Sequence, residues 1–167
     1  MKKTLALLMV ITLLVVSLSA LAEATLANPW VDSTRADIAE AIGATFGIPE
    51  GAAAITYSLM PETGLAEMRF TLDSRDYVAR IQPAGEFTDI SGLYYEWDAE
   101  APFAIAGMEG LEQRARIEPV GETVDLCQWF DADMGFMYAL SVIGAIPDDF
   151  DIAPIAGAIY AQAEEAE

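Results

Sequence analysis

The chain has 167 residues, of which 27 are acidic, eight are basic and none is histidine, so its formal charge is −19 at pH 7. Without histidine, a Ser-His-Asp or Cys-His catalytic centre and histidine-bound zinc are excluded. The negative charge excludes nucleic acid as a natural partner, because binding to phosphates depends on neutralising cations.

The first residues have the layout of a secretory signal peptide. Two lysines precede an apolar run over residues 5–16, and a small-residue Ala-x-Ala site ends at Ala22. A charged start, an apolar middle and small residues at the cleavage site are typical of such peptides. We therefore predict a signal peptide over residues 1–24, with cleavage after Ala22 or Ala24 and secretion of the remainder.

An uncleaved signal would instead tether the chain to a membrane, although the apolar run is shorter than the roughly 20 residues of a comfortable span. No second run of this kind follows, so no stable membrane span is expected after cleavage. Cleavage removes both lysines, and the six arginines and 27 acidic residues from Glu23 onward leave a charge of −21. A catalytic Schiff-base lysine is thereby excluded.

The first element predicted after the signal is a helix. Thr34 can cap it, and Asp37 at the third helical position places a carboxylate near the positive end of the helix. An apolar stripe continues to Phe46. Gly47 and Pro49 are expected to end the helix.

Residues 55–81 predict a three-stranded antiparallel meander, because apolar and polar residues alternate on either side of turns at 61–64 and 73–74. The loop lengths pair Leu59 with Ala66, Tyr57 with Met68, Ile55 with Phe70, Phe70 with Tyr77, and Glu67 with Arg80. In this register, the apolar side chains share one face and Glu67 attracts Arg80 on the other.

Residues 111–142 predict a second meander, with turns at 119–122 and 131–135. Its register sets Arg116 opposite Asp125, and Gln113 opposite Gln128. A last helix is expected to begin at Asp149 or Asp151 and to bury an apolar stripe that includes Ile152, Ile155, Ala156 and Ile159.

The simplest arrangement of these elements is an α+β fold of about six antiparallel strands in two three-stranded meanders. The N- and C-terminal helices are expected to pack on the apolar face, where Leu126 and Leu140 lie together. Cys127 and Trp129 fall on the polar face and need cover from the middle segment. This single domain spans residues 25–163, and an acidic frayed tail follows over residues 164–167.

Carboxylates are the remaining candidates for catalysis. A pair of carboxylic acids can hydrolyse a glycoside when an apolar pocket keeps one of them protonated. The candidates are Glu96, Asp98 and Glu100, which alternate with aromatic and small residues. Acidic residues are so common in this chain that an ordinary exposed strand or turn explains them as well.

The aromatic residues Tyr94, Tyr95 and Trp97 are candidates for binding, since aromatic rings can stack on sugars. The alternative is that they fill the core or cover the polar face of the second meander. No cofactor is expected.

Residues 131–135, Asp-Ala-Asp-Met-Gly, resemble the opening of a calcium loop. Glycine stands fifth rather than sixth, and Val142 occupies the twelfth position where a glutamate is needed. A hairpin turn is therefore favoured over a calcium site at Asp131 and Asp133, and a calcium-stabilised structural protein remains an alternative. Cys127 is the sole cysteine and cannot form an internal disulfide; burial and reactivity both remain open.

Several segments resemble a family of small exported bacterial proteins of unknown function. They are Asn28-Pro29-Trp30, the strand 64–68, the run 87–97 that contains Asp89-Ile90-Ser91-Gly92, and Trp129-Phe130-Asp131 before Gly135. The set is also similar to a domain on the outer side of membrane regulators of anti-sigma or sporulation type. The resemblance implies an extracytoplasmic α+β module, and it carries over no catalytic residue or cofactor.

Together these observations predict a non-catalytic extracytoplasmic module that binds or senses a ligand or a protein. The sequence does not identify this partner. One alternative is a carboxylate-dependent hydrolase that acts on glycan or cell-wall material, and the calcium-stabilised protein is the other.

Overall fold

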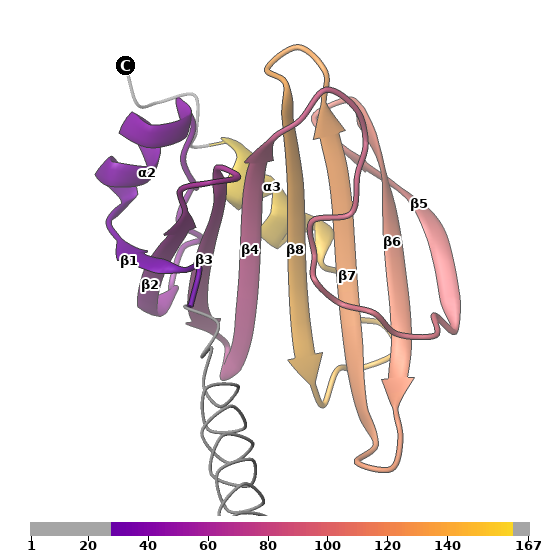
Figure 1. Ribbon diagram of the computed structural model, residues 1–167. Coiled ribbons are helices and arrows are strands. Elements are labelled where there is room, and N and C mark those ends of the chain that lie inside the picture. Colours follow the sequence, from indigo (N-terminus) through magenta and orange to yellow (C-terminus); the bar gives the residue numbers. More distant parts are fainter. Residues whose placement is uncertain (1–27, 162–167) are drawn as a thin grey trace, which may run out of the picture.

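One eight-stranded antiparallel sheet forms the body of the computed structural model, which describes residues 28–161 (Figure 1). The strands are β1 (Val31–Ser33), β2 (Ala53–Met60), β3 (Leu65–Leu72), β4 (Arg75–Pro83), β5 (Ala99–Ile105), β6 (Met108–Ile117), β7 (Glu122–Asp131) and β8 (Phe136–Gly144). Their order across the sheet is β1-β2-β3-β4-β8-β7-β6-β5. The helices are α2 (Arg35–Ile42) and α3 (Ala153–Ala161). The predicted signal peptide and acidic tail lie outside the described residues.

The expectation of six strands in two meanders is wrong, because the sheet has eight strands, with β4 paired to β8 near its centre. The two strands that the sequence did not reveal, β1 and β5, lie at the two edges. β1 has only three residues, and Pro102 and Ala104 blur the alternation of β5. Neither segment therefore carries a clear period of two.

The register predicted for β2, β3 and β4 is confirmed over most of its length. Leu59 pairs with Ala66, Tyr57 with Met68, Phe70 with Tyr77, and Glu67 with Arg80. The pairing of Ile55 with Phe70 is wrong, because the register shifts between Ala53 and Thr56. Ala54 adopts a φ of 51° at this bulge, which the alternation of side chains did not reveal.

The register predicted for β6 and β7 is wrong by two residues. Arg114, and not Arg116, lies opposite Asp125, and Gln113 lies opposite Leu126 instead of Gln128. Ile117 pairs with Glu122, so the turn spans residues 118–121, one residue earlier than the expected 119–122. Gly121 has a φ of 73° there and donates its backbone N–H to the Ile117 carbonyl, so the glycine sets the position of the turn.

Different parts of the chain cover the two faces of the sheet (Figure 1). Helix α3 packs on one side, which we call the helix face. The segment between β4 and β5, residues 84–98, runs across the other side; we call it the crossover segment, and this side the crossover face. Leu140 pairs with Cys127, and Leu126 with Ser141, so Leu126 and Leu140 point to opposite faces. The expectation of a single apolar face is therefore wrong.

Cys127 and Trp129 lie on the helix face, within the main core, and not on a polar face under the middle segment. Both are fully buried, and the Trp129 ring stacks on Tyr138 with centroids 5.1 Å apart. The smaller cluster on the crossover face consists of Leu65, Ile90, Leu126, Met137 and Ala139. Central strands buried on both faces do not alternate between apolar and polar residues, which is why the predicted polar face of β7 was misassigned.

Helix α2 begins as predicted. The Thr34 side chain accepts a hydrogen bond from the Asp37 backbone N–H, and the Asp37 side chain accepts one from the Thr34 backbone N–H, which forms a capping box. The helix ends earlier than expected, because Gly43 adopts the left-handed conformation with a φ of 78°. Figure 1 places α2 beside β1 and β2, and Ile38 is its one buried residue. Ile38 lies in the same core cluster as Ala156 and Ile159 of α3, so both helices contribute to the core of the helix face.

Helix α3 supplies the main cover of the helix face. Ala156 and Ile159 are buried there, together with Ile152 just before the helix. The Asp151 carboxylate accepts a hydrogen bond of 2.9 Å from the Ala153 backbone N–H, so an aspartate caps the helix close to the predicted start.

The position of Cys127 gives the first testable prediction. Burial is the main factor that raises the pKa of its thiol well above the usual range, so the reactive thiolate is scarce in the folded protein. At pH 8, we expect an aromatic disulfide reagent to modify the native protein about 100-fold more slowly than the protein unfolded in urea. Equal rates would show that Cys127 is accessible and that the assigned face of β7 is wrong.

Candidate functional site

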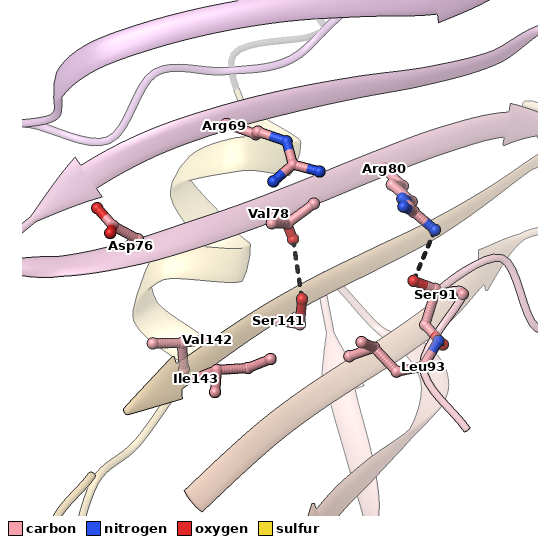
Figure 2. A pocket seen from close by; sticks show the side chains of 10 residues that line it. Arg69, Asp76, Val78, Arg80, Ser91, Leu93, Ser141, Val142 and Ile143 are labelled. Atoms are coloured by element: carbon pink, nitrogen blue, oxygen red, sulfur yellow. Dashed lines mark hydrogen bonds between the residues drawn. The ribbon is translucent and has the colours of Figure 1, made fainter. Parts of the chain in front are cut away.

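An open groove of about 390 Å³ lies on the crossover face, beside the part of the sheet that the crossover segment covers (Figure 2). Strands β3, β4 and β8 form its floor, and residues 91–93 of the crossover segment form one wall. The lining residues are Arg69, Asp76, Val78, Arg80, Ser91, Gly92, Leu93, Ser141, Val142 and Ile143.

A buried ion pair fixes the wall of the groove to its floor. The Glu67 side chain is 3% exposed, and its Oε2 accepts a hydrogen bond of 2.8 Å from Arg80 Nε. Arg80 Nη1 donates to the backbone carbonyls of Ile90 and Ser91 at 3.1 and 2.6 Å. The indole of Trp30 lies over the same guanidinium, 5.5 Å from ring centroid to Cζ. Arg80 thus holds β3, β4 and the crossover segment together.

The turn that meets Arg80 has a conformation set by its own residues. The Ser91 backbone N–H donates to Asp89 Oδ1 at 2.8 Å, and the Leu93 N–H donates to Ser91 Oγ at 3.1 Å. Gly92 has a φ of 65°, and a Cβ at this position would overlap Arg80 Nη1. The Asp89-Ile90-Ser91-Gly92 run is therefore the docking turn of the crossover segment.

Arg69 supplies the accessible positive charge of the groove. Its Nε donates to Glu67 Oε1 at 2.6 Å, yet its side chain remains 61% exposed. Within residues 28–161, no acceptor for its two terminal nitrogens is found, and Figure 2 shows the guanidinium reaching over Val78. Glu67, Arg69 and Arg80 together carry one net positive charge, in a chain of net charge −19.

The arginines are unevenly distributed between the two faces. Along their strands, Arg75, Arg114 and Arg116 share the helix face with Tyr77 and Asp125, since residues two apart point the same way. Arg69 and Arg80 point to the crossover face, and both line the groove. The two arginines that the strands present on the crossover face therefore both lie at the groove.

The rest of the lining is mixed. Val78, Leu93 and Ile143 provide apolar surface, and Ile143 is 39% exposed. Ser141 Oγ donates to the Val78 carbonyl at 3.5 Å on the floor (Figure 2). Asp76 stands at the far end and accepts a hydrogen bond of 2.8 Å from the Thr71 hydroxyl. A ligand here meets the Arg69 guanidinium, the apolar surface of Val78, Leu93 and Ile143, and the Asp76 carboxylate at the far end.

The predicted catalytic carboxylates lie outside this groove, where the crossover segment enters β5, and all three residues are exposed. Asp98 accepts a hydrogen bond of 2.7 Å from the Arg116 backbone N–H, and Glu100 accepts one of 2.7 Å from Gln113 Nε2. These two bonds support the pairing of β5 with β6. Glu96 precedes them on the crossover segment.

The predicted binding aromatics lie on the crossover segment. Tyr94 is 90% exposed and follows Leu93 of the groove wall. The Tyr95 and Trp97 rings meet edge to face at 5.9 Å, and Trp97 packs against the cluster on the crossover face that contains Met137. The three side chains therefore do not form one stacking surface.

The predicted calcium ligands lie in the hairpin between β7 and β8. Asp131 Oδ1 accepts backbone N–H bonds from Asp133 and Met134 at 3.0 and 2.9 Å, and its Oδ2 accepts a bond of 2.7 Å from the Tyr160 hydroxyl. Asp131 thus ties the hairpin to α3. Across residues 28–161, no group of three or more side chains suited to a metal ion is found.

The sequence interpretation missed the groove residues Arg69, Ser91 and Ser141. A signal for Arg69 was available, because it is one of six arginines after the predicted signal peptide and lies two residues from Glu67, so both point to the same face. The serines carried no such signal, since they come from segments 50 residues apart that meet only in the folded sheet.

Comparison of the chain with protein-family models, curated proteins and solved structures finds no match. The resemblance to exported bacterial proteins therefore stays a prediction. In the described part of the chain, neither helix has the length and apolar character needed to cross a membrane.

The role of Arg80 gives the second prediction. Arg80→Met leaves the Glu67 carboxylate buried without its main partner and removes the donor to two carbonyls of the crossover segment. We expect a loss of about 3–5 kcal/mol in the free energy of unfolding, measured with urea. The double variant Glu67→Met, Arg80→Met should recover at least half of this loss, because neither charge is then left alone. A single variant as stable as the parent would contradict this role.

Proposed function

We propose that this protein is a non-catalytic binding module that acts outside the cytoplasm. Its groove on the crossover face would hold a small ligand with an anionic head and an apolar body. The observation that carries this proposal is the Arg69 guanidinium, which is anchored through Nε alone and lies over an apolar floor. The predicted signal peptide supports the location.

The chemistry of Arg69 favours an anionic head. A guanidinium presents paired N–H donors that match the two oxygens of a carboxylate. Because Glu67 holds Nε at 2.6 Å, the side chain is already oriented, and less conformational entropy is lost on binding. The acidic remainder of the surface repels anions, so such a ligand is favoured where Arg69 and Arg80 lie together.

The walls favour an apolar body. Val78 lies on the floor of the groove and Leu93 on its wall, and Ile143 continues the apolar surface along β8. Pockets for small ligands are usually lined mostly by apolar groups, with a few polar groups that fix the orientation. The exposed Tyr94 follows directly after Leu93 and can extend this surface.

Octanoate is a suitable probe, because it joins one carboxylate to a short aliphatic chain. By isothermal titration calorimetry, we expect octanoate to bind, and acetate and octylammonium to bind at least tenfold more weakly. Arg69→Gln should weaken octanoate binding about tenfold, which corresponds to about 1.4 kcal/mol for a lost hydrogen bond to a charged group.

Arg116→Gln is the matched control, since it makes the same change of charge at an exposed arginine, 69% accessible, on the helix face of β6. It should leave octanoate binding unchanged. Three results would each contradict the proposal: octanoate binding to Arg69→Gln as tight as to the parent, octylammonium binding to the parent as tight as octanoate, or no binding of octanoate to the parent.

A further inference from the structure

A second hollow, of about 250 Å³, lies away from the groove, where β5 and β6 meet the segment that precedes α3. Glu112 and Arg114 of β6 line it, with Asp148 and Phe150 across from them. Arg114 Nη1 donates to the Asp148 carbonyl at 3.0 Å, and Nη2 donates to the Phe150 carbonyl at 3.1 Å. Arg114 therefore anchors the segment that leads into α3.

A buried carboxylate with one unpartnered oxygen lies beside this anchor. Asp125 is 0% exposed, and its Oδ2 accepts a hydrogen bond from Arg114 Nη2. Its Oδ1 is also buried, and no donor to it is found within residues 28–161. An acceptor that is buried without a partner costs free energy of desolvation. A hydrogen-bond donor to Oδ1 would offset this cost, but a neighbouring ionised carboxylate has none to offer.

Glu112 is placed to be that donor. Arg114 lies opposite Asp125 and Glu112 lies opposite Cys127, so the Glu112 and Asp125 side chains are diagonal neighbours on the helix face. A protonated carboxyl group donates one O–H bond, whereas a carboxylate only accepts. A proton on Glu112 would let its O–H donate to the unpartnered Asp125 Oδ1.

We propose that Glu112 and Asp125 share one proton, and that this proton keeps Arg114 engaged with the segment before α3. When the pH rises, the proton leaves to solvent and two carboxylates face each other beside one guanidinium. Repulsion then moves the Glu112 carboxylate away from Asp125 and weakens the hydrogen bonds from Arg114 to the carbonyls of Asp148 and Phe150. The pair is thus a pH-sensitive latch on the helix face.

The surrounding groups support a raised affinity for this proton. Burial is the first cause that raises the pKa of both Glu112 and Asp125. The Asp125 charge, and then that of Asp151 before α3, raise the pKa of Glu112 further, whereas Arg114 lowers both. The other titratable groups around the pair are Tyr77 of β4 and the Cys127 thiol of β7, and Glu100 of β5 and Asp148 before α3, which line the hollow together with Glu112.

The direction of the pH dependence follows from these shifts. A carboxyl group whose pKa is higher in the folded state favours folding while it is protonated. The contribution is fully present below the ordinary glutamate pKa of 4.5 and is lost as the pH rises through the raised value of the folded state. The folded protein therefore loses stability from this pair as the pH rises above 4.5.

Glu112→Gln tests the latch, because the glutamine amide can donate to Asp125 Oδ1 at every pH and carries no charge. We expect the variant to melt about 3 °C above the parent at pH 7 and at the same temperature as the parent at pH 4. Glu109→Gln, at an exposed position of the same strand, is the control for the overall charge and should show no such gain. A gain that is equal at both pH values, or absent at pH 7, would overturn the proposal.

Carboxyl ¹³C NMR of glutamate-labelled protein supplies a second measurement that does not depend on a stability change. The Glu112 resonance, assigned by its loss in Glu112→Gln, should titrate at a higher pH than the exposed glutamates. Titration together with the exposed glutamates would show that no proton is shared, and would likewise overturn the proposal.

Discussion

The buried pair of Glu67 and Arg80 is the constraint on which the crossover face depends. Two of the Arg80 nitrogens contact the Glu67 carboxylate, and the third binds two carbonyls of the crossover segment. Ions removed from water are tolerated only when nearly every donor and acceptor is used, and this pair meets that condition. Because Arg80 fixes the place where residues 90–92 cross the sheet, it also determines which part of the crossover face remains uncovered and accessible to a ligand.

Burial of both faces gives the groove a rigid floor. Val78 and Ser141 face the groove, while their neighbours Tyr77 and Leu140 belong to the core under α3. A floor that is packed from behind moves little, so a ligand meets a surface that is already formed. The same double burial explains why Cys127 and Trp129 are inaccessible, although an alternating pattern placed them on an outer face.

The predictable part of the fold was the part specified by local chemistry. The helix cap at Thr34 and the pairing of Glu67 with Arg80 follow from short-range rules, and both are confirmed. The register of β6 and β7 depends on where Gly121 turns the chain, and a shift of two residues preserves the alternation of faces. Sequence alternation therefore could not separate the pairing of Arg116 with Asp125 from that of Arg114 with Asp125.

The candidate site was harder to predict, because its residues meet only through long-range pairing. The β4–β8 contact brings Arg80 beside residues 141–143, and no local pattern marks it. Acidic residues were predicted as site residues because they are numerous. The Asp98, Glu100 and Asp131 side chains instead accept hydrogen bonds that stabilise strand pairing and a turn. In a chain this acidic, the scarce arginines carry more information about binding than the carboxylates do.

A crystal structure of the protein with octanoate tests the central claim most directly. We expect both carboxylate oxygens within hydrogen-bond distance of the terminal nitrogens of Arg69, and the aliphatic chain between Val78 and Leu93. Octanoate bound on the helix face, or an empty groove beside an unchanged Arg69 at saturating octanoate, would contradict a ligand site on the crossover face.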